Sequence, residues 1–164
     1  MMKAAVQLPS FERATEWLNG RVTTRQTKGH PTLVHFWSIS SEAAKINLAQ
    51  VAQIRDQRKR EGVCVIAVHV PQSEAEKDPK AVRDAISRLN ITEACALDND
   101  KRVSRGHEEL PAYFLFDPEG KIRSSAVGPN GLDVIEEDPG VLGHERGAEP
   151  AVGNLAGELE APRR

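Results

Sequence analysis

The segment His35-Phe36-Trp37-Ser38-Ile39-Ser40-Ser41-Glu42-Ala43-Ala44-Lys45 joins a short apolar run to a stretch of serines and alanines. The apolar run begins at Thr32, and its unbroken character is typical of a strand that is covered on both faces. Ser40 or Ser41 can cap a following helix, and Glu42 then lies in the first turn, where negative charge is favoured. The segment therefore predicts a buried strand that passes directly into a helix.

The rest of the chain continues this alternation of strands and helices. The helix is expected to end at Gly62, before a second apolar run at residues 63–70, which gives one β-α-β unit with a right-handed crossover. Downstream, the sequence predicts a helix opened by Pro79, a short strand at 94–97, a hairpin of residues 112–116 and 121–127, and a last short helix near Leu132. This order predicts an α/β fold of three layers, with a mixed central sheet flanked by helices.

Composition excludes several classes of protein. The 164 residues carry a net charge of −2, which gives no general attraction to nucleic acid or to an anionic membrane. The first twenty residues contain charged side chains, so no secretory signal is expected there, and no run reaches the ~18 apolar residues of a membrane helix. We therefore expect a cytoplasmic protein.

The charge is unevenly distributed and suggests where the domain ends. Residues 129–164 carry 3 Lys and Arg against 8 Asp and Glu, and they hold six of the twelve glycines. Such a segment buries too little apolar surface to offset the entropy of ordering it. We therefore expect one domain over residues 1–138 and a mobile acidic tail over residues 139–164.

The two cysteines, Cys64 and Cys95, both fall within predicted apolar strands. Their spacing matches neither a metal-binding nor a redox motif. Buried thiols behave as small apolar side chains with a raised pKa. We expect both to be structural, and we expect no metal site.

Several motifs together resemble thiol-disulfide oxidoreductases of the thioredoxin superfamily, in the branch that includes ResA and TlpA. They are the Phe36–Ser40 corner, the Val65–Pro71 strand end, the Leu110–Asp117 segment and the Gly120-Lys121 turn. The resemblance covers roughly residues 9–130, and a bacillary member of the branch is also similar at Asn19-Gly20 and in the insert from Ser73 to Pro79. It implies a thioredoxin-like fold.

The resemblance also implies a site from which the reactive atoms are missing. In this family, two cysteines stand at the positions of Ser41 and Ala44. The first attacks a substrate disulfide as a thiolate and the second resolves the mixed disulfide. Neither a hydroxyl nor a methyl group can form a disulfide, so this chain is expected to be inactive in dithiol-disulfide exchange. A deliberate substitution of both cysteines and a natural loss in a paralogue are both consistent with the sequence.

The same resemblance assigns the positions around the corner. Pro111 takes the place of the family's cis-proline, and the backbone of Leu110 is expected to pair with an extended peptide. An ordinary trans proline at the start of a strand is the alternative. The positions expected to shape the site are His35, Trp37, Glu42, Ala43 and Lys45.

Three of these positions have simpler interpretations. Trp37 is expected to be a core aromatic that is partly exposed at the site. Lys45 could support a thiolate, but a solvated surface lysine is favoured. His35 occupies the place of a buried aspartate in many thioredoxins; it could relay protons, although a core histidine bonded to the backbone is favoured.

The leading function is thus that of a thiol-disulfide oxidoreductase without its redox cysteines. Its expected partners are protein or peptide disulfides and a dithiol protein that exchanges electrons with it, and it needs no cofactor. The alternative is a redox-inert module that binds extended peptides at Leu110-Pro111. A hydrolase pairing Ser41 with a histidine such as His69, and a peroxiredoxin-like peroxidase, have little support because their characteristic motifs are missing.

Overall fold

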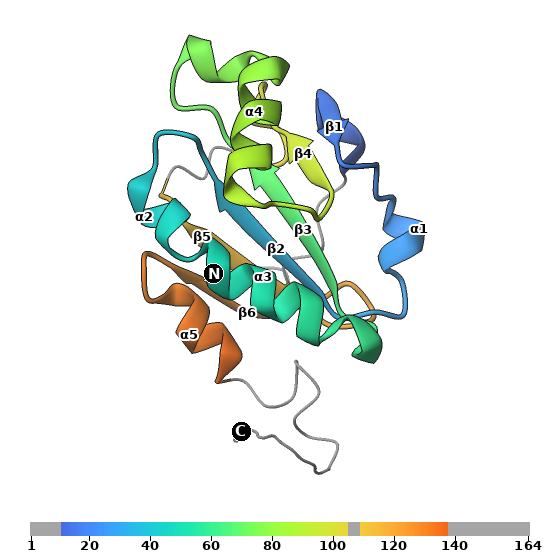
Figure 1. Ribbon diagram of the computed structural model, residues 1–164. Helices are drawn as coiled ribbons and strands as arrows, with labels where there is room; N and C mark the ends of the chain where they lie inside the picture. Colours follow the sequence, from blue (N-terminus) through green and yellow to red (C-terminus); the bar gives the residue numbers. More distant parts are fainter. Residues whose placement is uncertain (1–10, 105–108, 138–164) are drawn as a thin grey trace, which may run out of the picture.

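The computed structural model describes residues 11–104 and 109–137, which form a six-stranded mixed sheet with helices packed on it (Figure 1). The strand order is β1-β4-β3-β2-β5-β6. The central pair, β2 and β3, is parallel, and β5 runs antiparallel to β2. The strands are β1 (Glu16–Leu18), β2 (Thr32–Trp37), β3 (Cys64–His69), β4 (Cys95–Leu97), β5 (Ala112–Phe116) and β6 (Ile122–Val127). The α/β fold class predicted from the sequence is confirmed.

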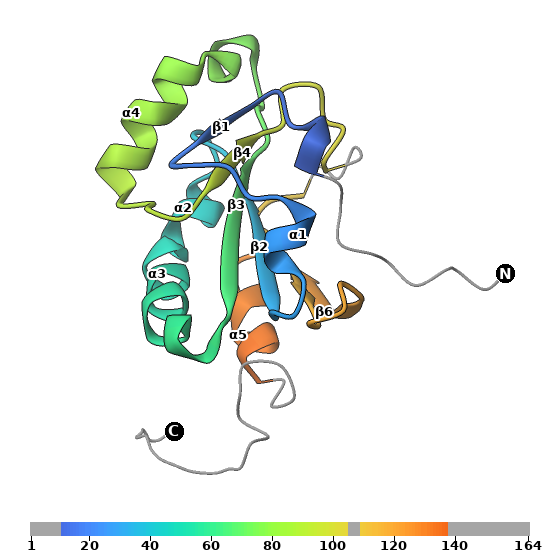
Figure 2. The same cartoon turned by 90° about the vertical axis from the view of Figure 1, so that its right-hand side faces the viewer.

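The longer helices share one face of this sheet. Two apolar clusters cover that face: Ala44, Leu48 and Ile86 pack on one half, and Val51 and Leu132 on the other. The opposite face is covered by residues 11–22 and the loop that carries Val103 (Figure 2). The helices are α1 (Thr24–Thr27), α2 (Glu42–Ile46), α3 (Leu48–Gln57), α4 (Pro79–Leu89) and α5 (Gly131–Glu136), with 3₁₀ turns η1 (Phe11–Arg13), η2 (Lys59–Glu61) and η3 (Glu74–Lys77).

The helix that follows β2 is broken, where the sequence predicted a continuous one. Asn47 ends α2 and precedes α3, with φ −92° and ψ 4°. Its side-chain amide donates to the carbonyl of Pro129 and to the hydroxyl of Tyr113. An asparagine side chain that bonds elsewhere competes with regular helix geometry. The break therefore ties the start of the helical layer to β5 and to the loop after β6.

Among the other helix boundaries, the start of α4 follows the expected signals. Asp78 caps α4 by accepting the Lys80 amide, and Pro79 occupies the first turn. Gly62 was expected to end the helix after β2, but α3 ends earlier, at Gln57, and Gly62 instead closes the η2 turn with φ 83°, a conformation that glycine adopts without strain. The expected acidic tail at 139–164 lies outside the described residues. Within the described part of the chain, no helix has the length and apolarity required to cross a membrane.

Candidate functional site

The corner between β2 and α2 is held by two serine hydroxyls. Ser41 precedes α2, and its Oγ accepts the Ala44 amide at 3.2 Å. The Ser41 amide in turn donates to Ser38 Oγ at 3.1 Å. Ala44 is buried, and its methyl group packs in the same cluster as Trp37. At the two positions where the resemblance predicts cysteines, this chain therefore has a helix-capping hydroxyl and a core methyl group.

The Leu110–Pro111 segment lies next to this corner, and the peptide bond between its two residues is cis. Phe36 pairs with Ala112 across the antiparallel β2–β5 ladder, so the end of β2 and Pro111 are neighbours at one end of the sheet. The Leu110 side chain packs against the cluster that contains Trp37 and Ala44. Among the described residues, no hydrogen bond uses the backbone N–H or C=O of Leu110.

Trp37 differs from its expected exposure. The side chain is fully buried, so the predicted partial exposure at the site is wrong. Its ring packs edge-on against His69, with the ring centroids 4.9 Å apart. The indole is buried in a cluster with Ala44 of α2 and Ile86 of α4, so Trp37 belongs to the core beneath the corner.

The polar residues of α2 form a surface pair. Lys45 Nζ lies 2.8 Å from Glu42 Oε2, and the Glu42 side chain is largely exposed. Ala43 is half-buried between them, and Ile46, at the end of α2, is 71% exposed. A surface ion pair of this kind contributes little to stability. Lys45 is paired with Glu42 at the surface, but its side chain is only 23% exposed, so it is less solvated than expected.

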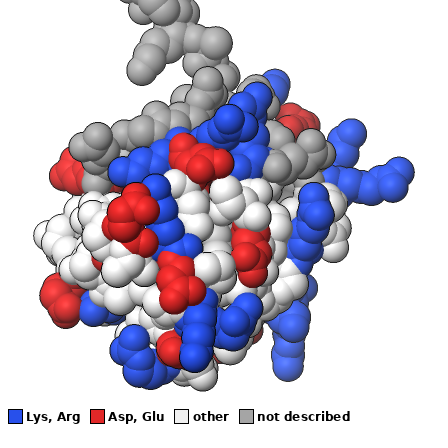
Figure 3. All heavy atoms as spheres, turned by 90° about the horizontal axis from the view of Figure 1, so that it is seen from above, with Lys and Arg blue, Asp and Glu red and all other residues white. Residues whose placement is uncertain are grey.

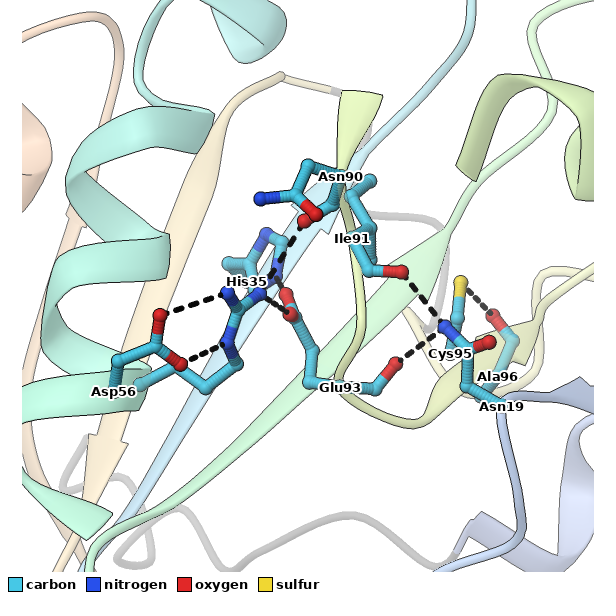
Figure 4. Close-up of polar contacts among 9 residues, drawn as sticks. Asn19, His35, Asp56, Asn90, Ile91, Glu93, Cys95 and Ala96 are labelled. Carbon is cyan, nitrogen blue, oxygen red and sulfur yellow. Dashed lines mark hydrogen bonds and ion pairs between the residues drawn. The ribbon is translucent and has the colours of Figure 1, made fainter. Parts of the chain in front are cut away.

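His35 is a buried histidine, but its partner is a carboxylate and not the backbone. Its Nε2 lies 2.6 Å from Glu93 Oε2, and both side chains are almost completely buried. The other Glu93 oxygen lies 2.8 Å from Arg55, which also contacts the exposed Asp56 (Figure 4). The expectation of a backbone bond is wrong because a carboxylate 58 residues away in the sequence occupies that place.

Charge pairing outweighs burial at Glu93. Desolvation raises the pKa of this carboxyl, but the hydrogen bonds and charges of His35 and Arg55 lower it to about 2. The Asn19 amide binds the Glu93 backbone carbonyl at 3.1 Å and the Ile91 carbonyl at 2.8 Å. The ionised Glu93 carboxylate is therefore connected through Arg55 to the exposed Asp56, so the network runs from the buried sheet to the surface.

His69 contributes to the corner in a way that the sequence did not reveal. Its Nε2 lies 3.3 Å from the Ile39 amide, and the ring is completely buried. The Ser41 hydroxyl is occupied by the Ala44 amide, and no hydrogen bond joins Ser41 to His69. The described residues therefore contain no serine–histidine pair of the hydrolase type.

The two thiols have different surroundings. Cys95 is completely buried, and burial raises its pKa to about 12. Cys64 is partly exposed, contrary to expectation, because it begins β3 at the end of the sheet; partial burial still raises its pKa. Cys95 pairs with Ala67, three residues along β3 from Cys64, so the two cysteines are offset by ~10 Å along the strands at ~3.3 Å per residue and are too distant for a disulfide.

Charges over the top of the molecule, around α4 and the β3–α4 insert, are mixed in sign. Figure 3 shows lysine and arginine side chains interspersed with aspartate and glutamate on this face. Among the described residues, no group of three or more His, Cys, Asp or Glu side chains could hold a metal ion. A surface of this kind provides no large single-sign field to attract a charged partner.

Comparisons with known proteins agree with this geometry. The thiol-disulfide oxidoreductase YkuV of Bacillus subtilis is 35% identical over 139 residues, which cover 83% of this chain and 93% of YkuV. ResA of the same organism, also a thiol-disulfide oxidoreductase, is 28% identical over 123 residues, covering 73% of this chain and 65% of ResA. No family model matches the chain.

Solved structures show the same similarity. A thioredoxin-like protein in its oxidized form superposes with a TM-score of 0.72 at 35% identity, covering 86% of this chain and 97% of that structure. StoA from Bacillus subtilis superposes with a TM-score of 0.60 at 22% identity, covering 82% and 95% respectively, which supports the fold alone. The likeness thus extends over nearly all of the described residues.

Proposed function

Because this chain belongs to the thioredoxin-like thiol-disulfide oxidoreductases, we propose that it keeps the family's place for a protein disulfide but performs no dithiol-disulfide exchange. The observation that carries this proposal is the pair Ser41 and Ala44, which stand beside the Leu110–Pro111 segment at the two redox positions. Exchange begins when a thiolate donates an electron pair to one sulfur of a disulfide and the other sulfur leaves as a thiolate. A capping hydroxyl and a methyl group supply neither that nucleophile nor the second thiolate that resolves the mixed disulfide.

The remaining thiols do not replace the missing pair. The Cys95 thiol has a pKa near 12 and is completely buried, so its reactive thiolate form is essentially absent at neutral pH. Cys64 lies at the start of β3, and the corner lies beyond the opposite end of the neighbouring parallel strand β2. Neither sulfur is therefore placed to react with a substrate held at Leu110.

Restoring the cysteines tests the proposal directly. The double variant Ser41→Cys/Ala44→Cys should catalyse reduction of a protein disulfide by dithiothreitol, whereas the present chain should not exceed the uncatalysed rate. All proteins should carry Cys64→Ser, because a partly exposed thiol could otherwise contribute background exchange. The matched control Ser41→Cys should form a mixed disulfide without turnover. Clear catalysis by the Cys64→Ser protein that keeps Ser41 and Ala44 would contradict the proposal.

A second candidate function rests on the Leu110 backbone. Its N–H and C=O have no partner among the described residues, and an extended peptide that pairs there would add a strand beside the corner. On this alternative, the chain is a redox-inert module that binds peptides without altering them. Isothermal titration with an extended peptide, and with the same peptide containing proline at the pairing residue, would distinguish strand pairing from non-specific contact. Equal affinity for both peptides would argue against strand pairing.

A further inference from the structure

His69 joins three segments around the corner. Its Nε2 faces the Ile39 amide at 3.3 Å, in the segment between β2 and Ser41. Its backbone carbonyl accepts the Asp98 amide at 3.0 Å, at the start of the loop after β4. The same Nε2 also lies 3.5 Å from Glu76 Oε1, in the η3 turn of the β3–α4 insert. One buried side chain therefore contacts the corner and the insert, while its backbone anchors the loop.

The donor in the first of these contacts determines the protonation state of the ring. A backbone N–H can only donate, so Nε2 must present a lone pair to Ile39. The imidazole is then neutral and carries its proton on Nδ1, which has no partner among the described residues. Burial favours the same state: desolvation lowers the pKa of His69 to about 4, although the nearby Glu76 charge opposes the shift.

We propose that His69 is a positioning residue whose neutral imidazole accepts the Ile39 N–H and thereby fixes the segment 38–41 that carries the redox position Ser41. Ser38 is completely buried, and its carbonyl and hydroxyl both accept the Ser41 amide. The anchor at Ile39 therefore acts one residue away from the group that orients Ser41. The role concerns the corner itself and holds whether or not the chain binds a peptide.

Protonation of His69 would release this anchor. With a proton on Nε2, the ring has no lone pair for the Ile39 N–H, and Glu76 Oε1 becomes the nearest acceptor. The Cys95 thiol, on the neighbouring strand β4, has a raised pKa and stays neutral, and the two Asp98 oxygens accept the Val103 and Ser104 amides at 2.8 Å. Glu76 is therefore the group that would receive the hydrogen bond, and the corner would be freed in acid.

Amide NMR of the full chain tests the proposal, with His69→Gln and His69→Phe as matched variants. Glutamine reaches as far as Nε2 and offers an acceptor that does not titrate, whereas phenylalanine keeps the packing against Trp37 and removes the acceptor. Hydrogen exchange at Ile39 should be similar in the wild type and His69→Gln, and at least tenfold faster in His69→Phe. Exchange at Asp98 should not change in any variant, because its partner is the backbone carbonyl of residue 69.

A pH titration supplies the second measurement, and its first part, on the wild type, needs no variant to fold. In the wild type, the Ile39 amide and the His69 ring should titrate together with a midpoint near pH 4. In His69→Gln the Ile39 transition should disappear, although Glu76 still titrates. Equal Ile39 exchange in folded His69→Gln and His69→Phe would overturn the proposal. An Ile39 amide chemical shift that does not change when His69 is protonated would also overturn the proposal.

Discussion

Replacing Glu93 by glutamine should remove about 3 kcal/mol from the free energy of unfolding at pH 7. The carboxylate lies 2.6 Å from His35 and 2.8 Å from Arg55 and is almost completely buried, so bulk water cannot take its place at His35 or at the inner side of Arg55. Its pKa is lowered from 4.5 to about 2, and at about 1.4 kcal/mol per pKa unit this shift corresponds to about 3 kcal/mol. Breaking a buried ion pair by removing one partner typically costs a similar ~3–5 kcal/mol.

Urea denaturation at several pH values measures this effect, with Asp56→Asn as the matched control. Asp56 belongs to the same network but lies at its solvent-exposed end, so its loss should change stability much less. Because the Glu93 pKa is lowered in the folded state, its contribution is complete above pH 4.5 and is lost as the pH falls through about 2. The difference between wild type and Glu93→Gln should therefore shrink in acid. A loss below about 1 kcal/mol at pH 7, or equal losses in both variants, would refute the reasoning.

Three further predictions concern the corner and the thiols. Ser41→Ala removes the acceptor of the Ala44 amide and should lower the free energy of unfolding by about 1 kcal/mol in urea denaturation; an unchanged midpoint would show that the cap contributes nothing. A thiol reagent should modify Cys64 in the native protein well before Cys95, which is buried with a pKa near 12; equal rates would contradict the assigned burial. Since the pKa of His69 falls from 6.5 to about 4 on folding, the unfolded state binds the extra proton, and the wild type should lose about 3 kcal/mol between pH 6.5 and 4 from this group. His69→Gln should flatten that part of the stability profile, and an unaltered profile would exclude the histidine as its source.

The central part of the fold could be predicted because its signals are local. The β2 and β3 runs are apolar without interruption, since both faces of the sheet are covered, and they form strands at almost the predicted residues. β1 was missed because Glu16–Leu18 is three residues long and shows no periodicity. The break at Asn47 depends on Pro129 and Tyr113, which are distant in sequence, so no local pattern marks it.

The proximity of the corner and the Leu110–Pro111 segment could be predicted, but the buried contacts around them could not. The corner at Ser41 and the Leu110–Pro111 segment were identified from short motifs, and the β2–β5 ladder places them together. The partner of His35 could not be identified, because many carboxylates in the sequence were equally plausible and only tertiary packing selects Glu93. The partner of His69 could not be identified either. It is a backbone amide, and because every residue except proline has one, the sequence does not single out Ile39.

The serine cap has a practical consequence for studying disulfide-exchanging relatives. Ser41 meets the hydrogen-bonding requirement of the first helical turn without sulfur, so the corner keeps its shape when no thiol is present. Calorimetric measurements on a cysteine-bearing protein mix the heat of association with the heat of bond exchange. A scaffold of the same shape that cannot react would report the first contribution alone, and subtracting it would isolate the energetics of the covalent step.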